Sequence, residues 1–423
     1  MKNESPFDPN ISVLTGGKDP HYSYGLVSAL GAAGIKLDLI GGNEFEIFAW
    51  PPEIRFLNLR GDQRKNAGLP DKINRVLNYY FRLLRYAARS KARIFHILWN
   101  NKFELFDRTL LMLFYKALGK KIVLTAHNIN INERDGGDSF LNRFSLRLQY
   151  RLCDRILVHT NKMKAKLVSE FGVSETKIVL IPYGINNAVP HTGLTGEQAR
   201  ARLGLRAENK VLLFFGGIAP YKGLHYLVEA FDIIAKQEPS ARLVIAGQSK
   251  DNGDYWKQIH AALQKKSWRD RLVQNIEYIS DRDIELYFKA ADVAVLPYVH
   301  IFQSGIFFLA YSFGVPVIAT DVGSLKEDIL EGKTGMLCEP QDAAALARVI
   351  QKFFQSDLYH HPESRRHEIL SFANKKHSWS EVVSITSAAY RGLLLEMERP
   401  DLLLDHGAND ETFSLNSHSG IQR

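Results

Sequence analysis

The chain has 423 residues, of which 45% are hydrophobic and 24% charged, and it carries a formal net charge of +8. This length exceeds what one hydrophobic core usually fills and predicts two domains of ordinary globular composition. No apolar run approaches the roughly 18 to 20 residues that a membrane-spanning helix needs, and the acids and prolines at the start do not fit a signal peptide, so we expect a cytoplasmic protein.

The positive charge favours anionic partners, and nucleotide sugars, anionic lipid surfaces and nucleic acid all qualify. The sequence has no helix-turn-helix, zinc-finger or RNA-binding aromatic motif, so we expect no nucleic acid partner. The two cysteines, Cys153 and Cys338, lie far apart and give neither a disulfide framework nor a metal-ligand spacing. They indicate a reduced compartment, and we expect no metal site.

The first half alternates short β-rich runs with amphipathic stretches, which is typical of a parallel sheet covered by helices on both faces. It begins with a strand at 11–14, the turn Thr15-Gly16-Gly17-Lys18 and a helix, which is the opening of a Rossmann-like unit. The two glycines suit a tight turn with positive φ and equally a close backbone approach to a phosphate, and the pattern leaves both open. Further strands are expected at 36–40, 54–57, 93–98, 121–126, 155–159 and 177–181.

The segment 71–93 is expected to form an amphipathic helix. One side of this helix carries Ile73, Leu77, Phe81, Leu84 and Ala88, and another carries Arg75, Arg82, Arg85 and Arg89. A basic face of this kind docks on an anionic membrane in some proteins and is simply solvated in others. The pattern favours a helix packed through its apolar side, and peripheral contact with the inner face of a membrane is a hypothesis.

A second α/β series follows a linker at 186–196, where Thr195 and Gln198 form a capping box for the next helix. Its strands are expected at 211–215, 242–246, 276–279, 293–296 and 315–320. Two consecutive α/β domains imply a ligand-binding cleft between them. The expected organisation is an amino-terminal domain at 1–190, a carboxy-terminal domain at 197–376, a helix at 378–397 that crosses back to the first domain, and a disordered tail at 401–423.

Two stretches of the second domain have the pattern of an anion site. In the first, Gly216 and Gly217 follow a strand and allow close backbone approach, while Lys222 places an ammonium group on a phosphate. In the second, Gln303-Ser304-Gly305 separates a buried strand from an apolar helix, whose first turn offers free N–H groups and a positive dipole end. Together they predict a phosphate site.

The blocks F-F-G-G-I-A-P-Y-K-G-L, A-R-L-V-I-A-G, A-A-D-V-A-V-L-P-Y, Q-S-G and G-V-P-V-I-A-T-D-V-G resemble, in order and spacing, the carboxy-terminal domain of family 4 glycosyltransferases. V-L-T-A-H-N, D-R-I-L-V-H-T and I-P-Y-G-I-N-N resemble the matching amino-terminal blocks, so the likeness covers nearly everything except the tail. The resemblance implies the GT-B fold, in which two Rossmann-like domains face each other across a cleft. It also implies retaining, metal-independent transfer of a sugar from a nucleotide diphosphate donor to a hydroxyl acceptor, with no cofactor beyond the donor itself.

Residue by residue, the resemblance implies several site contacts. Lys222 matches the lysine that binds the diphosphate, and Gly16 and Gly17 match the glycine loop near the donor phosphate. His127, just past the strand at 121–126, matches the histidine that contacts the donor sugar. These residues are therefore predicted to line the cleft.

Two positions depart from the family pattern. Gly217 stands where most members carry an arginine, and Ile301 and Leu309 stand where most carry the glutamates of a Glu-x7-Glu motif. We predict a subgroup in which Gln303, Ser304 and Gly305 supply amide and hydroxyl donors in place of these carboxylates.

The expected function is transfer to a saccharide or lipid-linked acceptor in polysaccharide or glycolipid biosynthesis. Two alternatives remain open at this point. One is a catalytically silent nucleotide-binding scaffold of an envelope assembly, which the departures at Gly217 and Leu309 favour. The other is a sugar-nucleotide epimerase, for which the sequence offers no carboxylate set suited to proton removal at a sugar carbon.

Overall fold

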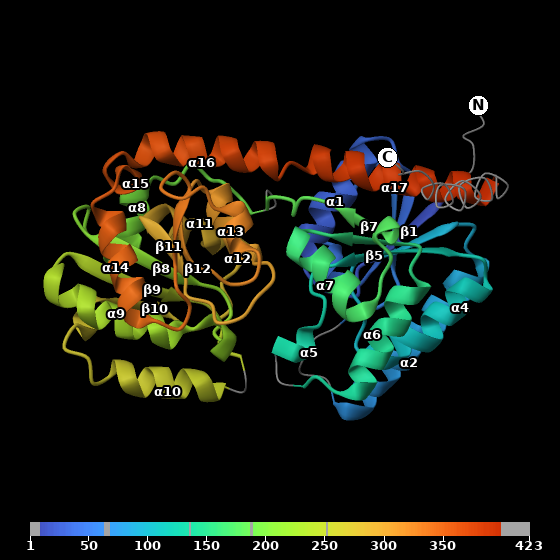
Figure 1. Ribbon diagram of the computed structural model, residues 1–423, viewed down its shortest axis with the longest axis horizontal. Coiled ribbons are helices and arrows are strands. Elements are labelled where there is room, and N and C mark those ends of the chain that lie inside the picture. The colour runs from blue at the N-terminus through green and yellow to red at the C-terminus, as the bar shows by residue number, and fades with distance from the viewer. Residues whose placement is uncertain (1–8, 63–67, 135–136, 187–188, 251–252, 399–423) are drawn as a thin grey trace, which may run out of the picture.

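The computed structural model describes residues 9–62, 68–134, 137–186, 189–250 and 253–398. These residues form two α/β units that lie side by side, each built on its own parallel sheet (Figure 1). The tail expected at 401–423 lies outside the described residues.

The first sheet has seven parallel strands in the order β3-β2-β1-β4-β5-β6-β7. Its central strands are apolar and fully buried because helices cover both faces, as the sequence predicts. The strands are β1 (Ile11–Leu14), β2 (Leu37–Gly41), β3 (Ile54–Asn58), β4 (Ile94–Ile97), β5 (Lys121–Ala126), β6 (Arg155–Val158) and β7 (Ile178–Leu180).

The helices of this half connect successive strands. They are α1 (Pro20–Ala32), α2 (Leu69–Arg89), α3 (Glu104–Phe106), α4 (Met112–Ala117), α5 (Ile131–Arg134), α6 (Phe140–Leu152) and α7 (Asn161–Phe171), with short turns η1 (Asn43–Phe45), η2 (Asp107–Leu111) and η3 (Glu175–Lys177).

The second sheet has six parallel strands in the order β10-β9-β8-β11-β12-β13. They are β8 (Lys210–Phe215), β9 (Ala241–Ala246), β10 (Leu272–Asn275), β11 (Val293–Leu296), β12 (Val317–Thr320) and β13 (Gly335–Cys338). The other elements of this half are α8 (Gly196–Arg202), η4 (Pro220–Lys222), α9 (Leu224–Gln237), α10 (Asp254–Leu263), η6 (Arg269–Arg271), α11 (Asp281–Ala290), α12 (Gly305–Ser312), α13 (Leu325–Asp328), α14 (Ala343–Phe354), α15 (Asp357–His360) and α16 (Pro362–Lys376).

Most of the expected strands are confirmed, and one is wrong. The strand expected at 276–279 is instead β10, four residues earlier, where Leu272 pairs with Leu243. This edge strand is partly exposed and ends in Gln274 and Asn275, so it lacks the apolar run that the prediction relied on. The run at 276–279 contributes Tyr278 and Ile279 to a cavity instead. The edge strand β13 was not predicted.

Helix α2 is present, but the packing expected for it is wrong. Its buried face carries Tyr79, Tyr80, Leu83 and Ala87, whereas Ile73, Leu77 and Phe81 of the expected packing face are more than half exposed. The tyrosines are buried because their hydroxyls donate to Asn101 and Asp107 inside the domain. The helix therefore exposes these three apolar side chains together with Arg82, Arg85 and Arg89.

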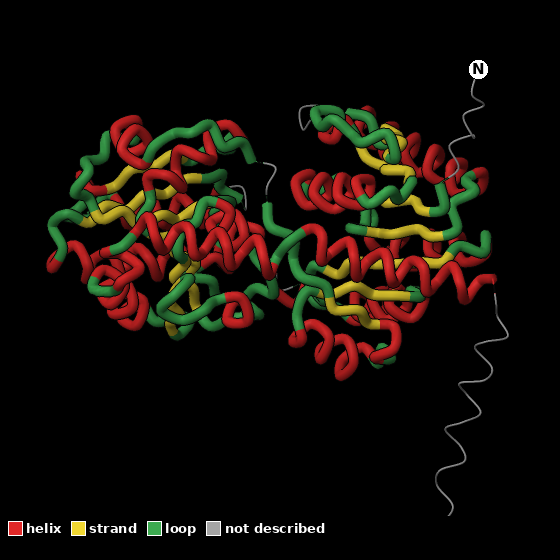
Figure 2. The backbone as a smooth tube through the Cα atoms, turned by 90° about the horizontal axis from the view of Figure 1, so that it is seen from above, coloured by secondary structure: helices red, strands yellow, loops and turns green. Residues whose placement is uncertain are grey.

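Helix α17 (Trp379–Glu398) returns from the second unit to the first. With α16 it runs along the top of both units in Figure 1, and in the view from above it passes across both of them (Figure 2). Trp379 fits against α1 where Gly25 leaves room, since a Cβ there would lie 2.2 Å from the indole. Arg155 pairs with Glu396, and His96 contacts the hydroxyl of Tyr390 at 2.5 Å, so this helix is tied to the first sheet.

The two units also meet directly across their interface. Tyr183 stacks on Phe308 with ring centroids 4.6 Å apart, and the buried hydroxyls of Thr160 and Ser324 lie 2.9 Å apart. Phe302 packs with the core of the first unit.

Both strand orders reverse direction beside the first strand, between β1 and β4 and between β8 and β11. Such switch points are where open parallel sheets bind ligands. The turns that follow β1 and β8 are the two glycine pairs, Gly16-Gly17 and Gly216-Gly217. Within the described part of the chain, no helix is both long enough and apolar enough to span a bilayer.

Candidate active site

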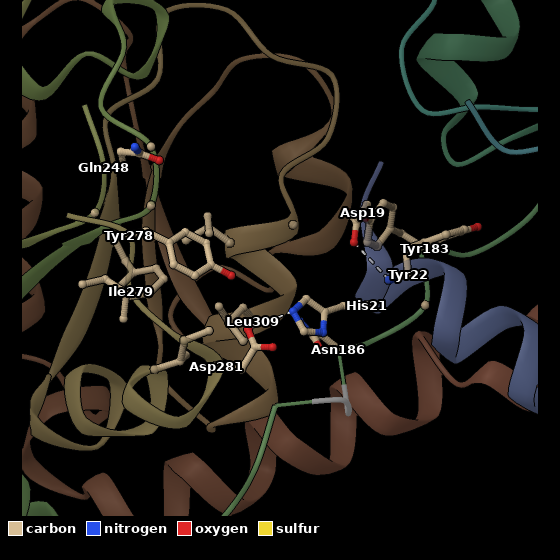
Figure 3. Close-up of a pocket in the computed structure, with 18 of the residues that line it drawn as sticks. Asp19, His21, Tyr22, Tyr183, Asn186, Gln248, Tyr278, Ile279, Asp281 and Leu309 are labelled. Atoms are coloured by element: carbon tan, nitrogen blue, oxygen red, sulfur yellow. Dashed lines mark hydrogen bonds and ion pairs between the residues drawn. The ribbon is translucent and has the colours of Figure 1, made fainter. Parts of the chain in front are cut away.

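A cavity of about 360 Å³ lies between the two units. The first unit contributes Asp19, His21 and Tyr22 of α1 and its cap, together with Tyr183 (Figure 3). The second unit contributes Gly216, Gly217, Gln248, Lys250, Tyr278, Ile279, Asp281, Gly305, Ile306 and Leu309. The cavity lies at the carboxyl ends of the strands, where parallel sheets bind ligands.

The turn after β8 forms part of the cavity wall. Gly216 has φ of 97°, and a Cβ there would lie 3.0 Å from the side chain of Ile306. A Cβ on Gly247 would lie 2.1 Å from the carbonyl oxygen of Gly216, so two glycine backbones touch. The absence of side chains lets a ligand approach the main chain at this point.

Gly217, the position of the missing family arginine, is covered by another cation. A Cβ on Gly217 would lie 2.6 Å from Cε and 3.3 Å from Nζ of Lys250, which lines the same cavity. Lys250 is exposed and follows β9, so the strand-end position is the only signal the sequence offers for it. The prediction of the site from sequence missed this lysine.

Lys222 is buried, with 7% of its surface exposed, and lies directly behind the glycine turn. Its Nζ would be 3.2 Å from a Cβ on Gly216 and is 5.4 Å from the ring centre of Tyr298. The ammonium group therefore lies next to the backbone of the cavity wall.

The three residues before α12 are placed differently from one another. Ser304 is buried and its Oγ lies 3.2 Å from the hydroxyl of Tyr298. Gln303 donates to Asp328 at 3.4 Å. Gly305 lines the cavity as the first residue of the helix, together with Ile306, so the backbone of this turn faces the space while the Gln and Ser side chains point elsewhere.

The two positions that lack the family glutamates are both apolar and buried. Leu309 is 3% exposed and lines the cavity, whereas Ile301 packs away from it. Asp281, at the start of α11, supplies a carboxylate to the same cavity and lies 3.0 Å from Nε2 of His21 across the cleft (Figure 3). Sequence reasoning missed Asp281.

Asp19 caps α1 with φ of 39°, and its Oδ1 accepts a hydrogen bond from the backbone N–H of Tyr22 at 3.0 Å. Its side chain is open to the cavity but deep between the two units, and this desolvation raises the pKa of the carboxyl group. The hydroxyl of Tyr183 donates to Oδ2 at 3.5 Å. In the sequence, Asp19 followed by Pro20 is the pattern of a helix N-cap.

Gly16 and Gly17 have φ of 61° and 67° and contact their own domain. A Cβ on Gly16 would lie 2.4 Å from the carbonyl oxygen of Trp99, and one on Gly17 would overlap the guanidinium of Arg60. Neither glycine lines the cavity, although Asp19 two residues later does.

His127 lines a second cavity of about 170 Å³ inside the first unit, with Trp99, Asn100, Arg108 and Gln149 among its other walls. The imidazole stacks on Trp99 with ring centroids 4.2 Å apart and makes an edge contact with Tyr22 at 4.6 Å. Tyr22 lines the first cavity, so this ring lies between His127 and the space beside the glycine turn.

A pair of histidines, His127 and His159, is held in the neutral form. Burial, followed by the neighbouring His159, lowers the pKa of His127 well below its ordinary value, and burial lowers the pKa of His159 to about 4. Nδ1 of His127 lies 3.1 Å from Nε2 of His159, and Nε2 of His127 has no hydrogen-bond partner among the described residues. This unpaired nitrogen is itself buried.

Across the described ranges, no three His, Cys, Asp or Glu side chains lie close enough together to hold a metal ion. Two lysines lie at the first cavity, Lys250 in its wall and Lys222 behind it.

Two family models match the chain in succession. Residues 21–189 match the model described as Glycosyltransferase Family 4, and residues 196–369 match Glycosyl transferases group 1. Together they span nearly all of the two sheets and the cavity between them. Each unit is therefore a glycosyltransferase domain of the kind that its own model describes.

Curated relatives of this glycosyltransferase share about a quarter of its residues. It is 28% identical over 216 residues to mannosylfructose-phosphate synthase of Agrobacterium fabrum. This alignment covers 49% of this chain and 46% of the relative. It is 28% identical over 249 residues to D-inositol 3-phosphate glycosyltransferase of Pseudarthrobacter chlorophenolicus, covering 57% of each. The chain thus spans about half the length of the curated relatives it matches.

Solved structures share the fold of this glycosyltransferase at lower identity. Sucrose-phosphate synthase from Thermosynechococcus elongatus has a TM-score of 0.74 and 21% identity, over 92% of this chain and 99% of that one. Anabaena HepE in complex with UDP-glucose has a TM-score of 0.69 and 16% identity, over 90% and 99%. These similarities confirm the predicted GT-B fold.

Proposed function

We propose that this glycosyltransferase moves a sugar from a nucleoside diphosphate to a hydroxyl acceptor with retention of configuration and without a metal. The observation that carries the proposal is the glycine turn Gly216-Gly217, which opens into the cavity with Lys250 above it and Lys222 behind it. Glycine backbone, two ammonium groups and the start of α12 are what a leaving diphosphate requires. That Anabaena HepE was solved with UDP-glucose supports a donor of this class.

The nucleoside is assigned to the Tyr278 side of the cavity. Tyr278 is exposed and offers a ring face to a base, while Ile279 and Leu309 form an apolar floor. Asp281 is the carboxylate of the second unit that lines this space, and we assign it to the ribose hydroxyls in place of the glutamate that Leu309 replaces.

The acceptor is assigned to the cavity beside His127, and its reacting hydroxyl reaches past Tyr22 to the donor in the interdomain cavity. This assignment departs from the expectation that His127 contacts the donor sugar, because Tyr22 lies between the imidazole and the interdomain cavity. In the transfer, the acceptor oxygen bonds to the anomeric carbon as the bond from that carbon to the phosphate oxygen breaks. The departing phosphate takes the acceptor proton on the same face, so configuration is retained. His127 is neutral and takes no proton in this scheme.

The acceptor class is a saccharide or a lipid-linked saccharide, within polysaccharide or glycolipid biosynthesis. The walls of the His127 cavity combine the Trp99 ring with the amides of Asn100 and Gln149, which suits a sugar ring and its hydroxyls.

A silent nucleotide-binding scaffold is the second candidate, because Leu309 removes the carboxylate that family members use. One experiment separates the two. The protein is incubated with uridine, guanosine and adenosine diphosphate sugars and with oligosaccharide and lipid extracts, and nucleotide release and labelled product are measured. We expect both with at least one pair, whereas tight nucleotide binding without turnover across the panel would establish the scaffold.

A further inference from the structure

The first unit exposes an unusual number of large apolar side chains on one group of helices. Ten of the fifteen large hydrophobic residues that are exposed in the described chain come from α2, the α3–α4 segment and α6. We call them the apolar face: Ile73, Leu77, Phe81, Phe103, Leu105, Leu110, Leu113, Phe140, Leu141 and Phe144.

These helices lie side by side. Tyr80 of α2 stacks on Phe103 and donates to Asp107 of η2, and Arg108 of η2 donates to Asn142 of α6 at 2.9 Å. Figure 1 shows α2, α4 and α6 together on the lower side of the first unit. The exposed apolar residues of α2 are at positions 73, 77 and 81, and this spacing of four places them on one face of the helix. That face lies next to Tyr80, which follows Tyr79 and precedes position 81.

The neighbouring face of α2 forms an arginine groove of about 410 Å³, lined by Arg55, Arg82, Arg85, Arg89, Leu59, Tyr86 and Ser90. Arg55 pairs with Asp38, but Arg82, Arg85 and Arg89 form no ion pair with any residue that the structure describes. Three like charges at spacings of three and four residues repel one another on a helix. An external anion would remove this repulsion.

We propose that this surface docks on a bilayer containing anionic phospholipid. Helix α2 then lies in the interface, with the arginine groove on lipid phosphates and the apolar face among the acyl chains. The charge supports this occupant, since α2 carries a single carboxylate, Asp71, and α6 carries three arginines and no carboxylate. A twofold contact between copies would instead bring arginine-rich helices against each other.

The docked surface covers the acceptor cavity from outside, and this part rests on the proposed function. Glu104 and Arg108 of the α3–η2 segment and Gln149 of α6 line the cavity beside His127, while the outer sides of the same elements carry the apolar face. A lipid-linked acceptor held in the bilayer is thereby brought close to the cavity beside His127.

The test is co-sedimentation of the full chain with vesicles of phosphatidylglycerol and phosphatidylcholine, compared with phosphatidylcholine alone, and without any sugar nucleotide. We expect the wild type to bind the anionic vesicles and to be partly released by salt. The variants R82E/R85E/R89E and I73N/L77N/F81N should each bind at least about tenfold more weakly.

Matched controls change equally exposed residues elsewhere. R202E/R206E/R348E removes three arginines from the second unit, and L330N/L395N removes two exposed leucines outside the apolar face. Both should bind vesicles like the wild type, and circular dichroism checks that all variants fold. The proposal would be overturned if the wild type did not bind the vesicles, or if the control variants lost as much binding as the test variants. It would also be overturned if the protein were a dimer that I73N/L77N/F81N dissociates and that does not bind vesicles. If the protein binds vesicles but never releases nucleotide, the proposed function is contradicted and the membrane-docking proposal for this surface is still supported.

Discussion

Each half of the protein opens with the same local sequence, a buried strand followed by two glycines, yet the two turns are built for different purposes. Gly16 and Gly17 both have positive φ and press on the Trp99 carbonyl and the Arg60 side chain. Gly216 and Gly217 open into the interdomain cavity, and the space above Gly217 is taken by the flexible side chain of Lys250. A shared motif at a switch point therefore becomes a rigid structural turn in one domain and a ligand wall in the other.

The sides of the cleft differ in charge as well. Around Tyr22, the first unit gathers Trp99, His127, His159 and Tyr183, which are aromatic or held neutral. The second unit brings lysines to its glycine turn. This difference predicts that donor charge is stabilised from the second unit and that the first unit supplies shape and neutral hydrogen bonds.

The largest effect is expected at Lys222. K222A should lower nucleotide release from the donor sugar by about one to three orders of magnitude, because a preorganised cation next to the leaving group is removed. Initial rates at saturating donor measure this. S304A is the matched control, since its hydroxyl contacts Tyr298 instead of the cavity, and it should cost less than about tenfold. Equal losses would show that the lysine acts through packing.

The next effect separates the two glycine turns by stability. G16A should lower the free energy of unfolding by about 2 to 4 kcal/mol, because it combines a positive φ with a 2.4 Å contact to backbone. G217A should cost less than about 1 kcal/mol, since Gly217 does not have a positive φ and Lys250 is able to shift. Denaturant titration of both variants measures the difference, and equal costs would contradict the comparison.

Acid should weaken the first unit before the second. Burial lowers the pKa of His96 to about 3 and of His159 to about 4, and lowers that of His127 too. Between the ordinary pKa near 6.5 and these values the unfolded chain binds more protons, so stability is complete above pH 6.5 and falls as the pH drops. We expect each of these histidines to cost about 2 kcal/mol of stability near pH 5.

Amide hydrogen exchange at pH 7 and pH 5 resolves this loss by domain. Protection should fall in β4, β5 and β6, which carry or precede these histidines, more than in β8 and β11. An equal fall in both sheets would contradict the assignment to the buried histidines.

The fold was predictable because strand periodicity and burial agree along most of the chain. Strands such as β5 and β11 are apolar runs that one reads directly from the sequence. The edge strand β10 was misplaced because its half-exposed residues lack that pattern. The buried face of α2 was predicted wrongly because its tyrosines are held by hydrogen bonds that periodicity does not reveal.

The candidate site was predictable where motif and backbone coincide, and less so where side chains converge from distant segments. Gly216, Gly217 and Lys222 lie together because they fall within seven consecutive residues. Lys250 and Asp281 reach the same cavity from the ends of other strands, and no local spacing connects them with position 217 or 309. Ser304 belongs to the predicted Gln-Ser-Gly motif, but its hydroxyl contacts Tyr298 instead of the cavity.

The smallest expected effect tests the central claim most directly, which is that Lys250 above Gly217 holds the donor diphosphate. Affinity for uridine, guanosine and adenosine diphosphates is measured by calorimetry for the wild type, K250A and G217R/K250A. K250A should weaken binding of the preferred nucleotide about tenfold, as expected for one charge-assisted contact. In G217R/K250A the arginine occupies the space that Lys250 vacates, so affinity should recover to within about threefold of the wild type. Equal affinities for all three proteins would contradict the account.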